Sequence, residues 1–155
     1  PATLPVPKGT RLAAAAAAWL NGKLHAALVD EAMPELVALF EHHASSWLPV
    51  GEMPVPRGQS GRGTRTSLSF VGNGDLLVAT DAGSVLRRRL LDGSVVASAM
   101  HAIDHKAAWQ GACSLQDGEG VAHLRLREDA HSMSPEVVAL KLIHGATAHQ
   151  PLFFD

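Results

Sequence analysis

Histidine is the residue type that most directly offers this chain a chemical site, because nine of the 155 residues are histidines. The segment MHAIDHKAAW holds His101, Asp104 and His105, and His123 follows in a separate apolar segment. Imidazoles and carboxylates from converging elements are the ligands of zinc and iron sites. Histidines that titrate near neutral pH also suit acid-base catalysis. One hypothesis is therefore a small enzyme or ligand-binding protein with a divalent metal at His101, His105 and His123.

Several features argue against that hypothesis. A spacing of four residues brings His101 and His105 together only on a helix, whereas their segment has the pattern of a strand end and a turn. The chain contains neither an HExxH pair nor a GxSxG nucleophile elbow. Its single cysteine, Cys113, rules out an internal disulfide and a multi-cysteine zinc site, and the apolar segment WQGACSL predicts a buried, inert thiol. We therefore expect isolated surface or capping histidines, no cofactor and no enzymatic activity.

The segment PRGQSGRGTR is a second candidate site, because it combines three glycines with Arg57, Arg62 and Arg65. Its Gly58 to Gly63 spacing matches a phosphate-binding loop, but the lysine is missing and a strand rather than a helix is predicted to follow. Arginine forks on a glycine-rich backbone can still bind a carboxylate or phosphate. The segment is therefore either a linker or a basic arm for an acidic protein partner, with nucleic acid as a further alternative.

A third candidate is LRRRLL, which contains Arg87, Arg88 and Arg89. On a strand these side chains alternate, so both faces receive charge. Such a strand is expected at a sheet edge or on an exposed face, where charge also prevents unwanted strand pairing. Residues 57–89 contain six arginines and two aspartates. We expect these arginines and the arm to form one basic docking patch, with edge protection as the alternative.

The elements that position these residues divide the chain into two parts. Two to three helices are predicted in residues 1–50. The first, RLAAAAAAWL, is capped by Thr10 and ends at Asn21-Gly22. The second is KLHAALVDEA, and the third, PELVALFEHHASSW, begins at Pro34. Residues 51–65 form a connector rich in proline, glycine and arginine.

Short apolar runs broken by glycine turns predict an antiparallel meander of six or seven strands in residues 66–155, either an open sheet or a partly closed barrel. Its last strand is Val137 to Ile143, although Ser134-Pro135-Glu136 could also open a helix. The expected fold is thus a single α+β domain over residues 1–155.

Composition favours a folded protein, because 46% of residues are hydrophobic and 18% are charged. No apolar run is long enough to span a membrane, and cytoplasm is the expected location. Trp19 and Trp47 are candidate anchors for a protein partner or a second copy, unless they close the protein's own core. The expected function is a non-catalytic protein-interaction or assembly module (adaptor, chaperone-like or structural subunit). The alternatives are the histidine site and, second, nucleic-acid binding through the arginine arm.

Overall fold

A computed structural model describes residues 3–4, 6–55, 65–72, 74–81, 83–100, 107–115, 119–129 and 132–144, and every regular element in those ranges is a β-strand. Sheet A has the order β1-β2-β3-β4, sheet B the order β12-β8-β7-β6-β5, and sheet C the order β11-β10-β9. All strand pairs are antiparallel. The strands are β1 (Leu12–Leu20), β2 (Lys23–Asp30), β3 (Met33–His43), β4 (Ser46–Pro54), β5 (Thr66–Val71), β6 (Asp75–Thr80), β7 (Ser84–Arg89), β8 (Val95–Met100), β9 (Ala107–Ser114), β10 (Gly120–Asp129), β11 (Ser132–Lys141) and β12 (Ile143–His144).

The predicted N-terminal helices, and with them the α+β class, are wrong: the described part of residues 1–50 contains β1, β2, β3 and most of β4. Asn21-Gly22 is the two-residue loop of a hairpin in which Leu20 pairs with Lys23. Both loop residues have positive φ, 51° and 77°, as a type I′ turn requires. The dipeptide that looked like a helix stop therefore reverses one strand into the next.

Alanine content misled the prediction for β1. Alanine has the highest helix propensity, but burial against a neighbouring sheet overrides such a preference. Exposure along β1 alternates residue by residue, with Ala14, Ala16 and Ala18 less exposed than Ala13, Ala15 and Ala17. This period of two belongs to a strand with one face packed on the core.

The antiparallel strands expected after Thr66 are confirmed. Val71 pairs with Asp75 across a turn that uses Gly74 at φ 91°, and Gly93 at φ 69° shapes the turn between β7 and β8. The described residues contain eight strands here, arranged in two sheets rather than in one meander of six or seven. The segment expected as the last strand contributes to β11 and β12, and β12 returns to pair with β8 in sheet B. Of the predicted connector, residues 51–54 belong to β4, and residues 56–64 lie outside the described part.

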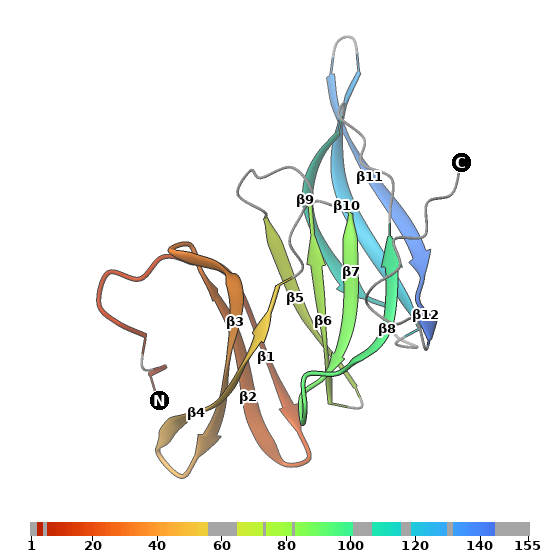
Figure 1. Ribbon diagram of the computed structural model, residues 1–155. Coiled ribbons are helices and arrows are strands. Elements are labelled where there is room, and N and C mark those ends of the chain that lie inside the picture. The colour runs from red at the N-terminus through yellow and green to blue at the C-terminus, as the bar shows by residue number, and fades with distance from the viewer. Residues whose placement is uncertain are drawn as a thin grey trace.

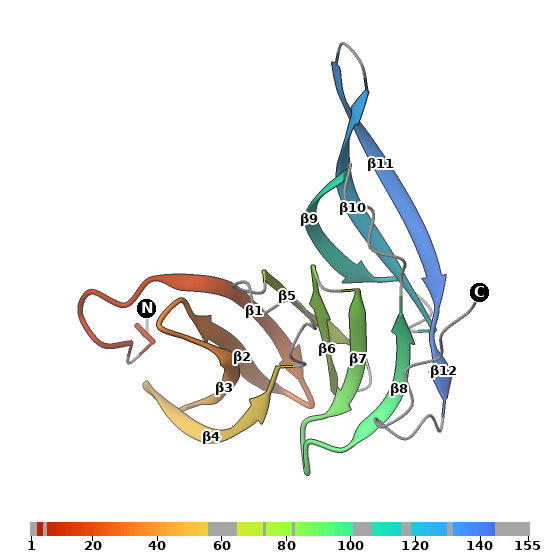
Figure 2. The ribbon, with the colours of Figure 1, turned by 45° about the horizontal axis from the view of Figure 1, so that its top comes forward.

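Sheet B lies between sheets A and C (Figures 1 and 2). One core joins sheets A and B through residues such as Val37, Met53 and Leu76. A second core joins sheets B and C through residues such as Leu77 and Val121. Strand β6 is buried at every residue, which explains why DLLVAT is almost continuously apolar.

The first strand of each sheet contacts the first strand of the next: β1 contacts β5, and β5 contacts β9. In Figure 2, the later strands β4, β8 and β11 lie farther from these contacts than β1, β5 and β9 do. The three sheets are therefore successive units packed face to face.

Candidate functional site

A groove of about 630 Å³ opens between sheets A and B, at the end where the β1–β2 and β5–β6 turns lie. Its volume falls within the range of ligand-binding clefts. Segments widely separated in sequence supply its walls: Leu20, Asn21, His25, Ala26, Leu39, Phe40, Glu41, Val50, Phe70, Gly74, Asp75, Arg89, Leu90, Leu91 and Val96. Only the packing of the two sheets brings these residues together.

The β7–β8 loop gives the groove its apolar rim. The Gly93 amide donates to the Arg89 carbonyl at 2.9 Å, and the Arg89 amide donates to the Ser94 carbonyl at 2.9 Å. The Ser94 amide also donates to Asp92 Oδ1 at 2.9 Å, and hydrogen bonding from Ser94 holds the pKa of Asp92 below its ordinary value. The closed loop places Leu90 against the core between the sheets, while Leu91 is 90% exposed.

The opposite wall carries a charged pair. Lys23 Nζ donates to Glu41 Oε1 at 2.8 Å, and His25 Nε2 lies 3.8 Å from Glu41 Oε2. The hydrogen bond from Lys23 is the main reason that the pKa of Glu41 lies below its ordinary value. Glu41 therefore stays ionised at neutral pH, a state that suits binding rather than proton donation.

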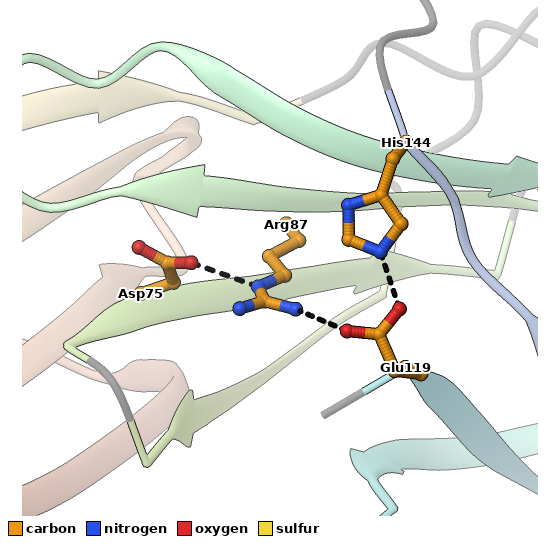
Figure 3. Close-up of polar contacts among 4 residues, drawn as sticks. All are labelled: Asp75, Arg87, Glu119 and His144. Atoms are coloured by element: carbon orange, nitrogen blue, oxygen red, sulfur yellow. Dashed lines mark hydrogen bonds and ion pairs between the residues drawn. The ribbon is translucent and has the colours of Figure 1, made fainter. Parts of the chain in front are cut away.

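Arg87 has a structural environment that the sequence prediction missed. Its Nε donates to Asp75 Oδ2 at 2.8 Å, and both side chains are more than nine-tenths buried. Arg87 Nη1 lies 3.6 Å from Glu119, which in turn forms an ion pair with His144 (Figure 3). The network joins β6 and β7 of sheet B to the segment before β10 and to β12.

The expectation that the arginine strand lies at an edge or on an exposed face is thus wrong, because β7 is flanked by β6 and β8. Arg87 and Asp75 lie on the same face of neighbouring strands, since Leu77 pairs with Arg87 and Asp75 pairs with Arg89. The buried carboxylate compensates the buried cation, which allows charge in an interior strand.

The remaining arginines lie in three different settings. Arg88 faces sheet A, donates from Nη1 to the Gly93 carbonyl at 3.0 Å, and has its pKa lowered by burial. Arg89 has a 54% exposed side chain at the groove, 3.7 Å from Asp92. Arg65 is exposed at the other end of sheet B, where its Nη1 donates to the Trp109 carbonyl at 3.5 Å. Arg57 and Arg62 lie outside the described residues. Arg65 and Arg89 are therefore not parts of one patch.

The predicted histidine site is described only at His123, since His101 and His105 fall in the part of the chain that the structure does not describe. His123 is buried in sheet C, and its Nδ1 accepts a hydrogen bond from Trp109 Nε1 at 3.2 Å. Within the described ranges no three histidine, cysteine, aspartate or glutamate side chains are grouped to hold a metal ion. Cys113, expected to be buried, is exposed.

The two predicted anchors both belong to edge strands of sheet A. Trp19 on β1 is 71% exposed. Trp47 on β4 is half-buried and packs edge-on against the His42 ring, with centroids 5.1 Å apart. The structure thus places one tryptophan fully on the surface and the other at its margin.

Sequence reasoning missed the groove because its residues carry no local signal. Leu39 and Phe40 lie in PELVALFEHHASSW, the segment that was predicted to be a helix. The single usable indication was Asp92-Gly93 after Leu90-Leu91, a tight turn that follows two apolar residues.

Comparison with models of protein families gave no match, and comparison with curated proteins gave none either. Among the described residues no helix is long and apolar enough to cross a membrane. One similar solved structure is a chain in a crystal structure of the mitotic checkpoint complex, with a TM-score of 0.49 and 16% identity. The match covers 84% of this chain but 37% of that chain, and a similarity at this level supports no functional assignment.

Proposed function

We propose that this protein is a non-catalytic interaction module whose groove between sheets A and B receives a polypeptide segment with an apolar anchor and an acidic side chain. The observation that carries the proposal is the combination of an apolar groove with one exposed arginine at its rim. Phe40, Phe70 and Leu90 line the wall, and Leu91 and Arg89 lie at the solvent side.

The charges of the groove favour an acidic partner. Glu41 accepts a hydrogen bond from Lys23, and Asp75 accepts one from Arg87. The charge of each carboxylate is therefore compensated by a cation of the protein itself. Within the described part of the chain, Arg89 has one ionic contact, a long and solvent-exposed one with Asp92 that contributes little to stability. Its guanidinium can therefore turn to a carboxylate of the partner and bind it in two-pronged fashion.

The apolar contacts supply the larger part of the expected affinity. Burial of one large side chain contributes about 1.5–3 kcal/mol. A segment that places one aromatic or aliphatic residue against Phe70 and Leu90 therefore gains an anchor, whereas Arg89 mainly selects the orientation and the charge. Of the predicted basic docking patch, this proposal keeps Arg89; a binding role for Arg57 and Arg62 stays a prediction.

Selection from a displayed random-peptide library against the whole chain tests this function. We expect enrichment of peptides that combine an apolar residue with a nearby aspartate or glutamate. The change Arg89→Glu should weaken their binding at least about tenfold, the effect of losing one charge-assisted hydrogen bond.

Arg65→Glu is the matched control, because it makes the same charge change at an exposed arginine on the opposite end of sheet B. Binding should survive this change. Failure to enrich any peptide motif, or equal losses in the two variants, would contradict the proposed function.

A further inference from the structure

The face of sheet C that points away from sheet B is apolar and exposed. We call it the C face, and it consists of Cys113, Ala122, Leu124, Leu126, Met133, Pro135, Val137, Ala139 and Lys141, which alternate with the residues that face sheet B. Val137 is 68% exposed, and Met133 and Leu124 are also exposed. Lys141 is a charged member of this set, and the register also places Glu128 on this side, opposite Met133.

Sheet C carries apolar side chains on both of its faces, unlike an outermost sheet with a polar outer side. On the side that faces sheet B, Arg125 Nε donates to Glu136 Oε2 at 2.7 Å, and His123 is buried. Along β11, Val138 and Leu140 also face sheet B, whereas Met133, Pro135, Val137 and Ala139 point outward. Antiparallel sheets at a protein surface normally place polar side chains outward, so a large outward apolar face indicates an interaction surface.

Sheet A has a similar apolar face on its side away from sheet B. We call it the A face. The strand register places these residues on it: Ala13, Ala15, Ala17, Trp19, Leu24, Ala26, Leu28, Leu36, Ala38, Phe40, Trp47 and Glu52. Ala26 and Leu28 are buried within one copy, so the exposed part of the face lies mainly along β1. Trp19 and the alternate alanines of β1 are exposed. Glu52 is the single charged member of this set.

We propose that the C face of one copy packs on the A face of a second copy, and that the reciprocal contact closes a two-copy ring of six sheets. The chain already makes this kind of contact twice, sheet A on sheet B and sheet B on sheet C, each time with first strands in contact. The A and C faces are the surfaces on which the same packing would continue in each direction. Rings of radially packed sheets have about four to eight members, so two copies fit and three do not.

The two faces are complementary in size and in charge. The exposed alanines of β1 leave room for larger side chains such as Leu124 and Val137, and Trp19 supplies the kind of aromatic anchor that dominates interfaces. Glu52 on one face and Lys141 on the other are opposite in sign.

The area is also sufficient. Three or four strands about 4.8 Å apart and eight to eleven residues long give each face roughly 500 Å². The two contacts of a ring use four such faces, roughly 2,000 Å² in total, which reaches the size of a stable interface. A single contact would bury only half of that area, which favours closure over an open chain of copies.

Native mass spectrometry and light scattering of the full chain test the ring. The expected mass is twice the 16.3 kDa of one chain. Ala15→Glu on the A face and Val137→Lys on the C face should each give a monomer, because either change breaks both contacts of the ring. Both positions are exposed within one copy, so urea unfolding of these monomers should match that of diluted wild-type protein.

Leu91→Lys is the control, since it puts a lysine on an equally exposed apolar residue in the groove. It should impair peptide binding and leave the dimer intact, so a failure of the groove proposal and a failure of the ring are distinguishable. Alkylation of the native Cys113 gives a second readout without mutation: it should slow as protein concentration rises, because the C face becomes covered.

Three results would overturn the inference. If the wild-type chain is a monomer at micromolar concentration, a second copy does not cover the A and C faces. Disruption by only one of Ala15→Glu and Val137→Lys indicates a face that pairs with itself. Assemblies that lengthen with concentration indicate an open chain rather than a ring.

Discussion

At the scale of single residues, the buried Asp75–Arg87 pair has the largest expected effect on stability. Arg87→Ala leaves the Asp75 carboxylate buried without its 2.8 Å donor. Breaking such a pair costs about 3–5 kcal/mol, which urea unfolding can measure directly. Arg89→Ala is the matched control, since its exposed side chain should change the free energy of unfolding by less than about 0.5 kcal/mol. Similar stability of the two variants would show that Arg87 is not held as described.

The Lys23–Glu41 pair gives a prediction about pH. The folded pKa of Glu41 lies below its ordinary value of 4.5, mainly because of the hydrogen bond from Lys23. The pair therefore stabilises the fold above the unfolded pKa, and this stabilisation is lost as the pH falls through the folded pKa. In Lys23→Met, an NMR titration should find the pKa of Glu41 raised toward 4.5. The pKa of Asp92, lowered by Ser94, should stay unchanged; an unmoved pKa of Glu41 would contradict the account.

At the scale of elements, the hairpin turns explain both the successes and the failures of sequence-based prediction. After Thr66, glycine turns between apolar runs correctly predicted antiparallel strands, because positive φ is a local requirement. Before residue 50 the same signal, Asn21-Gly22, was assigned to a helix end, because the alanine run has a strong helix propensity. Strand β6 illustrates a second difficulty: a strand buried on both faces has no alternation, so its sequence cannot indicate which sheets cover it.

Gly22 tests the first hairpin directly. Its φ is 77°, and a Cβ added there would meet no atom within 4 Å, so Gly22→Ala changes backbone strain alone. We expect a loss of about 1 kcal/mol or more in the free energy of unfolding. Gly51→Ala is the control, because Gly51 also has open space but no positive φ. Equal behaviour of the two variants in thermal unfolding would rule out the left-handed turn.

At the scale of the whole molecule, the features that the sequence did not predict are those that arise from the packing of one sheet on another. The groove, the Asp75–Arg87 pair and the apolar A and C faces all depend on which sheet faces which. The sequence predicted antiparallel strands joined by glycine turns after Thr66, but no local pattern indicated which sheet faces which. Trp19, predicted as a candidate partner anchor or as part of the core, is exposed on β1 rather than on a helix, and a binding role for it stays a prediction.

The stack predicts a gradient of local stability. Strand β6 is an interior strand of sheet B and is covered on both faces, so its amides should exchange with deuterium most slowly. Those of β1, an edge strand of an outer sheet, should exchange faster. Hydrogen exchange read by mass spectrometry separates the two segments, and equal protection would contradict the three-layer order.

The most direct test of the central claim, an acidic and apolar segment bound in the groove, is a charge-exchange cycle. The affinity of one selected peptide is measured with the wild-type chain and with Arg89→Glu, and then again after its acidic residue is replaced by lysine. We predict that each single change weakens binding and that the two changes together restore part of it, because the carboxylate introduced by Arg89→Glu can pair with the new lysine of the peptide. Losses that simply add would mean that the acidic residue does not contact Arg89, and the proposed mode of binding would be wrong.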